Sequence, residues 1–228
     1  MKPDLEIQMP TASRGTCRFC SIVEGTADIA ALHDSPWLKG EQYAAFVSVG
    51  ALVKGWSLVA PRQHTLNLLS QYGSKAFFRF LDQAHRIVTK DFGPTVVFEH
   101  GSQHHLSQTS CGTAHAHMHL VPLSFSLESA SEQFDETLRW QTCRATEISS
   151  VVAGNEYLFV ADRYDSDATV GQLAILREGR SQFFRQVIAT RLGCPDLFDY
   201  KTHPQYDLTK ESARRLLNFS NAELASVA

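Results

Sequence analysis

Six of the ten histidines in this 228-residue sequence fall within twenty residues, and three of these alternate with other residues in His115-Ala-His117-Met-His119. In a β-strand, alternate side chains point to the same face about 7 Å apart, so these imidazoles would form a row. A neutral imidazole is a nucleophile toward phosphorus, and neighbouring histidines can donate hydrogen bonds to phosphoryl oxygens. The pattern therefore predicts phosphoryl-transfer chemistry. A solvated histidine-rich strand or a bare metal site is the alternative.

The pair Cys17-Arg-Phe-Cys20 is a second candidate for chemistry. Two cysteines at this spacing can supply two thiolates to a zinc ion, or they can form a redox dithiol. No thioredoxin-like strand and helix surround the pair, which favours zinc. The total of five cysteines is odd, and the chain is long enough to bury a core without staples, so a disulfide framework is not expected.

The composition is that of an ordinary globular protein, with 43% hydrophobic and 20% charged residues. The net charge of -3 lacks the basic excess of a dedicated nucleic-acid binder, so no nucleic-acid polymer is expected as a partner. The longest apolar stretch, around residues 43–53, is interrupted and about half as long as a membrane span. The first fifteen residues include acidic residues and no apolar signal-peptide segment, so we expect a cytoplasmic protein without a membrane anchor.

The surrounding sequence predicts the elements that would position these residues. Residues 1–15 are expected to be a flexible lead-in. Strand-like runs, turn residues and one helical repeat follow in the order strands, helix, strands, which predicts an α+β domain with an antiparallel sheet over residues 16–125. The expected strands are 43–49, 56–60, 95–99 and 114–122, and the expected helix is 74–91, which Gly93-Pro94 would stop.

Residues 126–228 are expected to form a C-terminal α/β extension that packs on this domain. Strands are predicted at 156–161 and 171–176, followed by an amphipathic helix with Ser181 as its N-cap and Gly193 as its stop. Three arginines within residues 177–185 open this helix and could bind phosphate, with a solvated basic face as the alternative.

Three blocks of the sequence resemble, in order, the histidine-triad (HIT) family of nucleotide hydrolases and transferases. The resemblance covers roughly residues 16–123 and rests on Cys17–Gly25, Gly55–His64 and His115–Val121. It implies a HIT-like antiparallel sheet of about five strands with helical cover, pairing into a homodimer, and catalysis through a covalent nucleotidyl-histidine. We therefore expect this fold for the first half of the chain.

The resemblance also assigns roles to individual residues. His117 matches the nucleophile that attacks the α-phosphorus, with its second ring nitrogen held by a backbone carbonyl, and His119 would contact the phosphoryl group or the leaving group. The positions that bind zinc in zinc-containing members are matched by Cys17, Cys20, His64 and His115. A shell of four protein ligands leaves no open position for water, so this zinc would be structural.

The implied nucleotide pocket matches the family in part. Phe19, Ile22 and Phe46 occupy base-pocket positions and are apolar, whereas Ser48 stands where the family commonly places Asp or Asn for the ribose hydroxyls. Trp56 replaces the fourth active-site histidine that is common in the family, and an indole cannot act as an acid or a base.

A second branch of related enzymes matches the loop before the histidines. Phe98-Glu-His-Gly101 and Ser110-Cys-Gly-Thr-Ala-His resemble the corresponding block of galactose-1-phosphate uridylyltransferases and dinucleoside-polyphosphate phosphorylases. Backbone N–H groups of Cys111, Gly112 and Thr113 could cradle phosphates there. In those transferases glutamine is typical at the third histidine position, where this chain has His119.

Three functions follow as hypotheses. The first is a nucleotide hydrolase that cleaves a nucleoside 5′-phosphoryl bond, of a dinucleoside polyphosphate or a nucleoside phosphoramidate, through His117. The second is a nucleotidyltransferase or phosphorylase that uses the same intermediate. The third, kept open by Trp56, is a zinc-stabilised nucleotide-binding module without catalysis.

Overall fold

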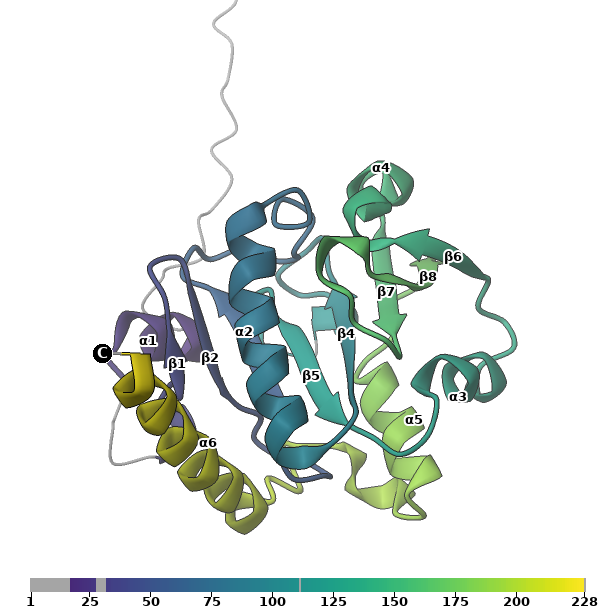
Figure 1. Cartoon of the computed structure of the whole chain (residues 1–228). Coiled ribbons are helices and arrows are strands. Elements are labelled where there is room, and N and C mark those ends of the chain that lie inside the picture. Colours follow the sequence, from purple (N-terminus) through teal and green to yellow (C-terminus); the bar gives the residue numbers. More distant parts are fainter. Residues whose placement is uncertain (1–16, 28–31, 111, 228) are drawn as a thin grey trace, which may run out of the picture.

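The computed structural model describes residues 17–27, 32–110 and 112–227. Its strands form one antiparallel sheet of eight strands in the order β1-β2-β3-β5-β4-β7-β8-β6 (Figure 1). The predicted lead-in, residues 1–15, lies outside the described residues. The strands are β1 (Leu38–Lys39), β2 (Tyr43–Val47), β3 (Ser57–Pro61), β4 (Thr95–Gly101), β5 (Met118–Pro122), β6 (Trp140–Arg144), β7 (Glu156–Ala161) and β8 (Val170–Leu176).

The prediction of a sheet of about five strands is wrong, because strands from the second half of the chain join the same sheet. β7 pairs with the side of β4 that does not face β5, and β8 and β6 continue outward from β7. All seven residues of β4 are buried, so an unpaired β4 edge would leave buried backbone N–H and C=O groups without partners. The predicted C-terminal extension therefore supplies three strands of the sheet.

The two edges of the sheet are β1 and β6. β6 is largely exposed, and its sequence Trp-Gln-Thr-Cys-Arg is mostly polar, as is typical of a protected edge strand.

The homodimer implied by the family resemblance stays a prediction, which light scattering on the purified protein would test.

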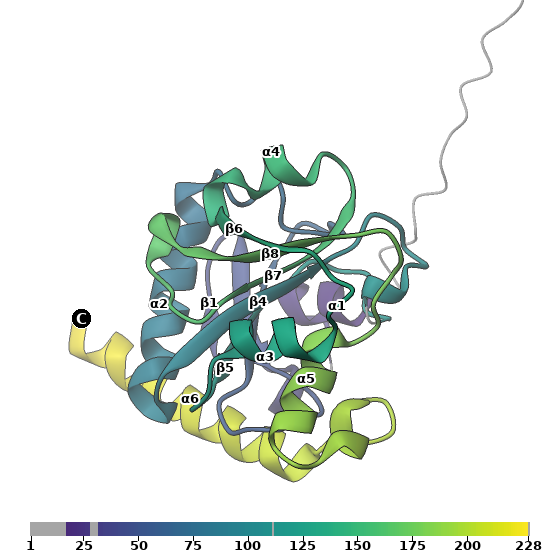
Figure 2. The ribbon, with the colours of Figure 1, turned by 90° about the vertical axis from the view of Figure 1, so that its right-hand side faces the viewer.

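Two layers of helices cover the sheet. One face carries α2 (Lys75–Phe92), α4 (Ile148–Val152) and α6 (Tyr206–Val227), and the other carries α1 (Arg18–Glu24), α3 (Leu127–Phe134) and α5 (Phe183–Arg191). Figure 2 shows α2 and the pair α1 and α5 on opposite sides of the strands. Each face has its own apolar core, because strand side chains alternate between the two. Among the described helices, none is both long and apolar enough to cross a membrane.

The helix predicted at residues 74–91 is confirmed as α2. The Ser74 hydroxyl accepts a hydrogen bond from the backbone N–H of Phe77, which caps the helix start. The apolar residues that recur every three or four positions are buried against the sheet, and Gly93, at φ 101°, leaves the helical conformation. This helix packs on the face of the sheet opposite His119 of β5.

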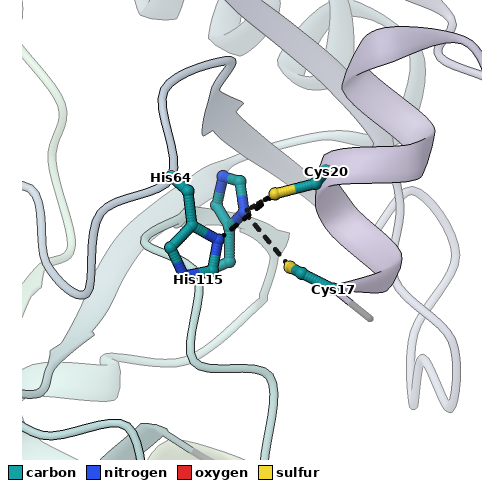
Figure 3. A group of neighbouring side chains, drawn as sticks. All are labelled: Cys17, Cys20, His64 and His115. Atoms are coloured by element: carbon teal, nitrogen blue, oxygen red, sulfur yellow. Dashed lines mark hydrogen bonds between the residues drawn. The ribbon is translucent and has the colours of Figure 1, made fainter. Parts of the chain in front are cut away.

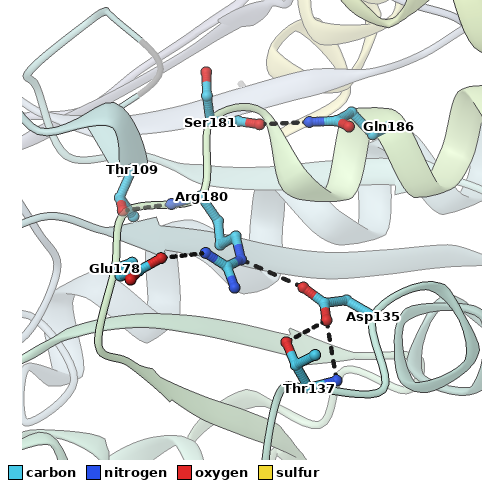
Figure 4. Close-up of polar contacts among 7 residues, drawn as sticks. All are labelled: Thr109, Asp135, Thr137, Glu178, Arg180, Ser181 and Gln186. Atoms are coloured by element: carbon cyan, nitrogen blue, oxygen red, sulfur yellow. Dashed lines mark hydrogen bonds and ion pairs between the residues drawn. The ribbon is translucent and has the colours of Figure 1, made fainter.

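The predicted start of the helix in the second half is wrong. Gln182, not Ser181, precedes α5, and its left-handed backbone (φ 51°) begins the helix without a side-chain cap. Arg180 lies in the loop before it, where its guanidinium contacts Asp135 at 3.3 Å and Glu178 at 3.7 Å (Figure 4). Its backbone N–H donates to the Thr109 hydroxyl. Arg180 thus links the segment before α5 to neighbouring loops through ion pairs. For this arginine the structure agrees with the predicted alternative of a solvated basic face.

Candidate functional site

Two cysteines and two histidines from three parts of the chain converge beside α1 (Figure 3). Cys17 and Cys20 are three residues apart at the start of this helix, so both sulfur atoms lie on the same side of it. His64 follows β3 and His115 precedes β5. The structure therefore brings together the four residues that match the family's zinc positions.

The dimensions of this group suit a tetrahedral ion. Zinc bonds of about 2.3 Å to sulfur and about 2.0 Å to nitrogen place sulfur and nitrogen ligands about 3.5 Å apart. The Cys17 Sγ lies 3.4 Å from Nδ1 of His115, and the Cys20 Sγ lies 3.2 Å and 3.6 Å from Nδ1 of His64 and His115. All four ligand atoms lie within 4.8 Å of one another. The chemistry and spacing of the donors both fit a four-coordinate metal site.

His115 is held in the form that a metal ligand needs. Its Nε2–H donates to the Pro61 carbonyl at 2.9 Å, which leaves the lone pair of Nδ1 toward the two thiols. Burial lowers the pKa of His115 to about 4, so the ring is neutral at pH 7.

The three alternating histidines do not form the predicted row, because β5 begins only at Met118. His115 and His117 lie in the segment before the strand, which follows left-handed backbone at Gly112 and Ala114. His115 joins the cysteines, whereas the rings of His117 and His119 lie together, with centroids 4.6 Å apart. The cluster is therefore divided between a metal-type group and a second pair of imidazoles.

His117 has the orientation expected of a nucleophile. Its Nδ1–H donates to the His115 carbonyl at 2.8 Å, so Nε2 keeps its lone pair. Burial lowers the pKa of His117 to about 4, which keeps the imidazole neutral at pH 7. The Phe19 ring meets the imidazole edge-on, with centroids 5.1 Å apart. These contacts fix both the tautomer and the position of the ring.

His119 is the complement of His117, because its Nδ1 is an acceptor. The indole N–H of Trp56 donates to this atom at 3.0 Å, and the Phe98 ring stacks on the imidazole at a centroid distance of 4.2 Å. An indole can only donate, so Nδ1 of His119 is unprotonated and the ring proton of the neutral imidazole is on Nε2. Burial, with smaller effects from His117, His100 and Arg185, holds the pKa of His119 well below its usual value.

His100 is a third neutral imidazole beside this pair. It lies on the same face of β4 as Phe98, and its Nε2 accepts the backbone N–H of Phe184 at 3.4 Å. Burial, together with the charges of His117 and Arg185, lowers the pKa of His100 to about 3. The ring of His100 meets the ring of His119 edge-on, with centroids 5.8 Å apart. His100, His117 and His119 therefore form one group of neighbouring imidazoles.

A cavity of about 210 Å³ lies over these rings. Two of its lining residues are cationic, and among the described residues that line it none is acidic. This balance suits an anionic ligand. The lining residues are Cys17, Arg18, Phe19, Ser48, Val49, Leu58, His100, Gly112, Thr113, His117, His119, Arg185 and Tyr200.

The predicted nucleotide-binding residues are placed unequally. Phe19, Ser48, Gly112 and Thr113 line the cavity together with His117 and His119. Ile22 and Phe46 do not line it; they are fully buried in the core below, where the Phe46 ring contacts that of Phe19. Cys111 lies outside the described residues. Of the three apolar residues predicted for the base pocket, only Phe19 therefore lines the cavity.

Comparisons with known proteins add little to this geometry. No family model matches the chain, and no curated protein matches it. Among solved structures, the chain is similar to a hypothetical protein from Leishmania major, with 21% identity and a TM-score of 0.39 over 50% of this chain and 77% of that one. It is also similar to SMU.412c from Streptococcus mutans UA159, with 22% identity and a TM-score of 0.39 over 55% of this chain and 78% of that one.

Two cavity residues come from the second half of the chain. Arg185 is one of the three arginines for which the sequence offers phosphate binding or a solvated basic face, whereas Tyr200 was not predicted. Arg185 of α5 is only 3% exposed, and its guanidinium lies over the rings of Trp56, at 4.9 Å, and Tyr200, at 5.7 Å. Its Nε donates to the Phe198 carbonyl at 2.7 Å. An arginine inside the run Phe183-Phe184-Arg-Gln-Val187-Ile188 was the available signal, since it stands among core residues. Tyr200 lies in a polar segment and gave no signal.

Glu99, next to His100 in β4, points to the opposite face of the sheet and is 1% exposed. Its carboxylate accepts hydrogen bonds from the hydroxyls of Tyr72 and Tyr157, at 2.5 and 2.6 Å, and from the backbone N–H of Leu68 at 2.7 Å. Burial outweighs these three donors and raises the pKa of Glu99 to about 7. This carboxyl is separate from the cavity and lies in the core on the other face of the sheet.

We expect Glu99→Gln to change how stability depends on pH. The pKa of Glu99 rises from 4.5 to about 7 on folding, so its contribution is fully present below pH 4.5 and is lost as the pH rises through 7. The difference in unfolding free energy between variant and wild type should shift in favour of the variant by about 3 kcal/mol between pH 4.5 and pH 8. Urea unfolding of both proteins at each pH measures it. A difference that does not change with pH would contradict the raised pKa.

Proposed function

We propose that the protein is a HIT-type nucleotide hydrolase that cleaves a nucleoside 5′-phosphoryl bond through a covalent intermediate on His117. The observation that carries the proposal is the pair of opposite tautomers: His117 keeps a lone pair on Nε2, and His119, beside it, keeps a proton on Nε2. One ring can therefore attack phosphorus while the other donates a hydrogen bond to a phosphoryl oxygen.

The reaction would proceed in two displacements at the α-phosphorus. Nε2 of His117 forms a bond to phosphorus, and the bond from phosphorus to the leaving group breaks, so the leaving group takes the electron pair. The Nδ1–H bond to the His115 carbonyl stabilises the positive charge that the ring acquires. Water then attacks phosphorus and the bond from phosphorus to Nε2 breaks, so that His117 departs as a neutral imidazole and the proton lost by the attacking water passes to solvent. The Nε2–H of His119 would stabilise the negative charge that builds on the phosphoryl oxygens in both steps.

A trapped intermediate tests this proposal. We expect the wild-type protein, incubated with a dinucleoside polyphosphate labelled at the α-phosphorus and quenched in base, to carry label that acid releases, as a phosphorus–nitrogen bond would. His117→Ala should carry none. His104→Ala, which removes an exposed histidine of a neighbouring loop, is the matched control and should label normally. If nucleotides bind but no substrate labels the wild-type protein, the chain is a binding module and not an enzyme.

We propose zinc as the ion of the Cys17, Cys20, His64 and His115 group. Two thiolates and two imidazoles are a donor set that zinc takes up in tetrahedral structural sites, and their separations fit that geometry. The ion would stabilise the fold without entering the reaction, because four protein ligands leave no open position. Its effect would be to tie α1, with Phe19, to the segment that carries His115 and His117.

A nucleotidyltransferase or phosphorylase is the second candidate, because Gly112 and Thr113 line the cavity beside His117. Backbone N–H groups of such a turn can hold an acceptor phosphate. Product analysis with and without inorganic phosphate separates the two activities. A hydrolase releases the nucleoside monophosphate in both cases, whereas a phosphorylase releases the nucleoside diphosphate only when phosphate is present.

A further inference from the structure

Trp56 stands where a fourth histidine was expected, and its contact with His119 restricts what the site can do. The indole N–H occupies Nδ1 of His119, so this nitrogen cannot take up a proton while the hydrogen bond holds. The remaining proton, on Nε2, belongs to a neutral imidazole and is far too weakly acidic to be transferred. His119 can therefore donate a hydrogen bond, but it cannot act as a general acid.

Other candidate acids near the cavity are restricted in the same way. Nε2 of His100 accepts a backbone N–H, and His117 is the attacking group. No aspartate or glutamate is among the described residues that line the cavity, and the Glu99 carboxyl faces the other side of the sheet. Within the described residues, then, no histidine or carboxyl group of the cavity is placed to protonate a leaving group.

Arg185 supplies a buried positive charge in place of an acid. Its position is fixed by hydrogen bonds from its guanidinium to the carbonyls of Phe198 and Gly50 and by the rings of Trp56 and Tyr200. Gly50 permits this approach, because a Cβ there would lie 3.0 Å from the Arg185 guanidinium and 2.5 Å from Cβ of Tyr200. The turn that carries Tyr200 also carries Lys201, whose ammonium lies 2.9 Å from the position that a Cβ would take at Gly112.

Asp199, an acidic residue near Arg185 in the structure, is held by hydrogen bonds outside the cavity. Asp199 accepts hydrogen bonds from the Gln182 amide and from the backbone N–H of Lys201 through the same carboxylate oxygen. These contacts direct it toward the turn that carries Tyr200, and it does not line the cavity. Of the residues that α5 and the following turn contribute to the cavity lining, Arg185 is positively charged and none is acidic.

We propose that the site takes phosphoanhydrides, whose leaving group departs as a phosphate oxyanion without a proton, and that Trp56 and Arg185 set this preference. The inference rests on the proposed function and narrows its substrate class. When Nε2 of His117 bonds to phosphorus, the bridging oxygen keeps the electron pair of the broken bond, and its negative charge lies against Arg185. A phosphoramidate would have to release an amine, which requires a proton that neither the histidines nor any carboxyl group of the described cavity lining supplies.

Three probes with the same nucleoside separate the two parts of this proposal. A dinucleoside tetraphosphate has an anionic leaving group of low basicity, and a nucleoside 5′-p-nitrophenyl phosphate has one of low basicity without a phosphate. A nucleoside 5′-phosphoramidate of a primary alkylamine has a basic leaving group. We expect the wild-type kcat/KM for the tetraphosphate to exceed that for the phosphoramidate by about 100-fold or more, with the p-nitrophenyl ester between them.

Variants assign the preference to the two residues. Arg185→Met should lower kcat/KM for the tetraphosphate at least about 10-fold more than for the p-nitrophenyl ester, and Arg185→Lys, which keeps the charge, should restore part of this difference. Trp56→His, which replaces the indole with a group that can exchange protons, should reduce the preference over the phosphoramidate about 10-fold or more. Unchanged ratios in these variants would overturn the roles of Trp56 and Arg185.

Nitrogen NMR of the histidine side chains tests the tautomer without any substrate. We expect His119 to be neutral with its proton on Nε2 at pH 7 in the wild-type protein, and Trp56→Phe to lose this fixed state. A proton on Nδ1 would overturn the inference, as would equal turnover of phosphoramidate and tetraphosphate. If phosphoramidate and tetraphosphate are turned over equally but His117 carries label, the proposed enzyme stands and only the substrate preference fails. If none of the three probes labels the protein, both proposals fail.

Discussion

Replacing His117 by glycine is expected to lower kcat/KM for a dinucleoside polyphosphate by about 10⁴-fold or more, because the covalent route has no other nucleophile. Nε2 of His117 is the lone-pair nitrogen that the structure places in the cavity, with its ring held by the His115 carbonyl and by Phe19. The neighbouring His119 and His100 have the nitrogens that face Trp56 and Phe184 committed to hydrogen bonds. Steady-state hydrolysis rates measure the loss.

Added imidazole distinguishes a lost nucleophile from a damaged fold. His117→Gly leaves a space the size of an imidazole ring beside the cavity, so millimolar imidazole should restore part of the activity and yield a nucleoside phosphorimidazolide. The metal content of the variant should equal that of the wild type, because His117 is not among the four metal-type residues. A loss of less than about tenfold, or a loss that imidazole does not reverse at all, would argue against nucleophilic catalysis by this residue.

Local sequence patterns predicted the individual elements better than their assembly. The repeat of apolar residues in α2 is a property of one segment, so the sequence contained it in full. The pairing of β4 with β7 depends on contacts between segments about sixty residues apart. β6 escaped prediction because an edge strand is largely exposed and need not be apolar, and Trp-Gln-Thr-Cys-Arg shows no buried alternation.

The site was predictable where a motif encodes it and not where the fold creates it. Cys17, Cys20, His64 and His115 converge as the resemblance implied. The division of the histidine row was not predictable from alternation, because Gly112 and Ala114 turn the backbone before β5 begins. Arg185 reaches the cavity only because α5 packs on the same face of the sheet as α1, a contact that no local pattern specifies.

The second large effect is expected from Cys20→Ser, which should remove zinc and destabilise the fold. The Cys20 sulfur is the member of the group that contacts both histidine nitrogens, at 3.2 and 3.6 Å, and the residue is 2% exposed. We expect about one zinc ion per wild-type chain and little in the variant. Unfolding free energy should fall by about 3 kcal/mol or more, a fraction of the roughly 10–16 kcal/mol that zinc contributes in small zinc-binding peptides. Metal analysis and urea unfolding measure the two effects.

Cys143→Ser is the matched control, because Cys143 is equally buried, at 4% exposed, but lies on the other face of the sheet, away from the metal-type group. It should retain zinc and activity, whereas Cys20→Ser should also lose activity. The reason is mechanical: α1 has only seven residues, too few to be stable alone, and Cys17 makes no side-chain cap. Without the ion, Phe19 would no longer be held against His117. Full activity in a zinc-free Cys20→Ser protein would show that the helix positions itself without metal.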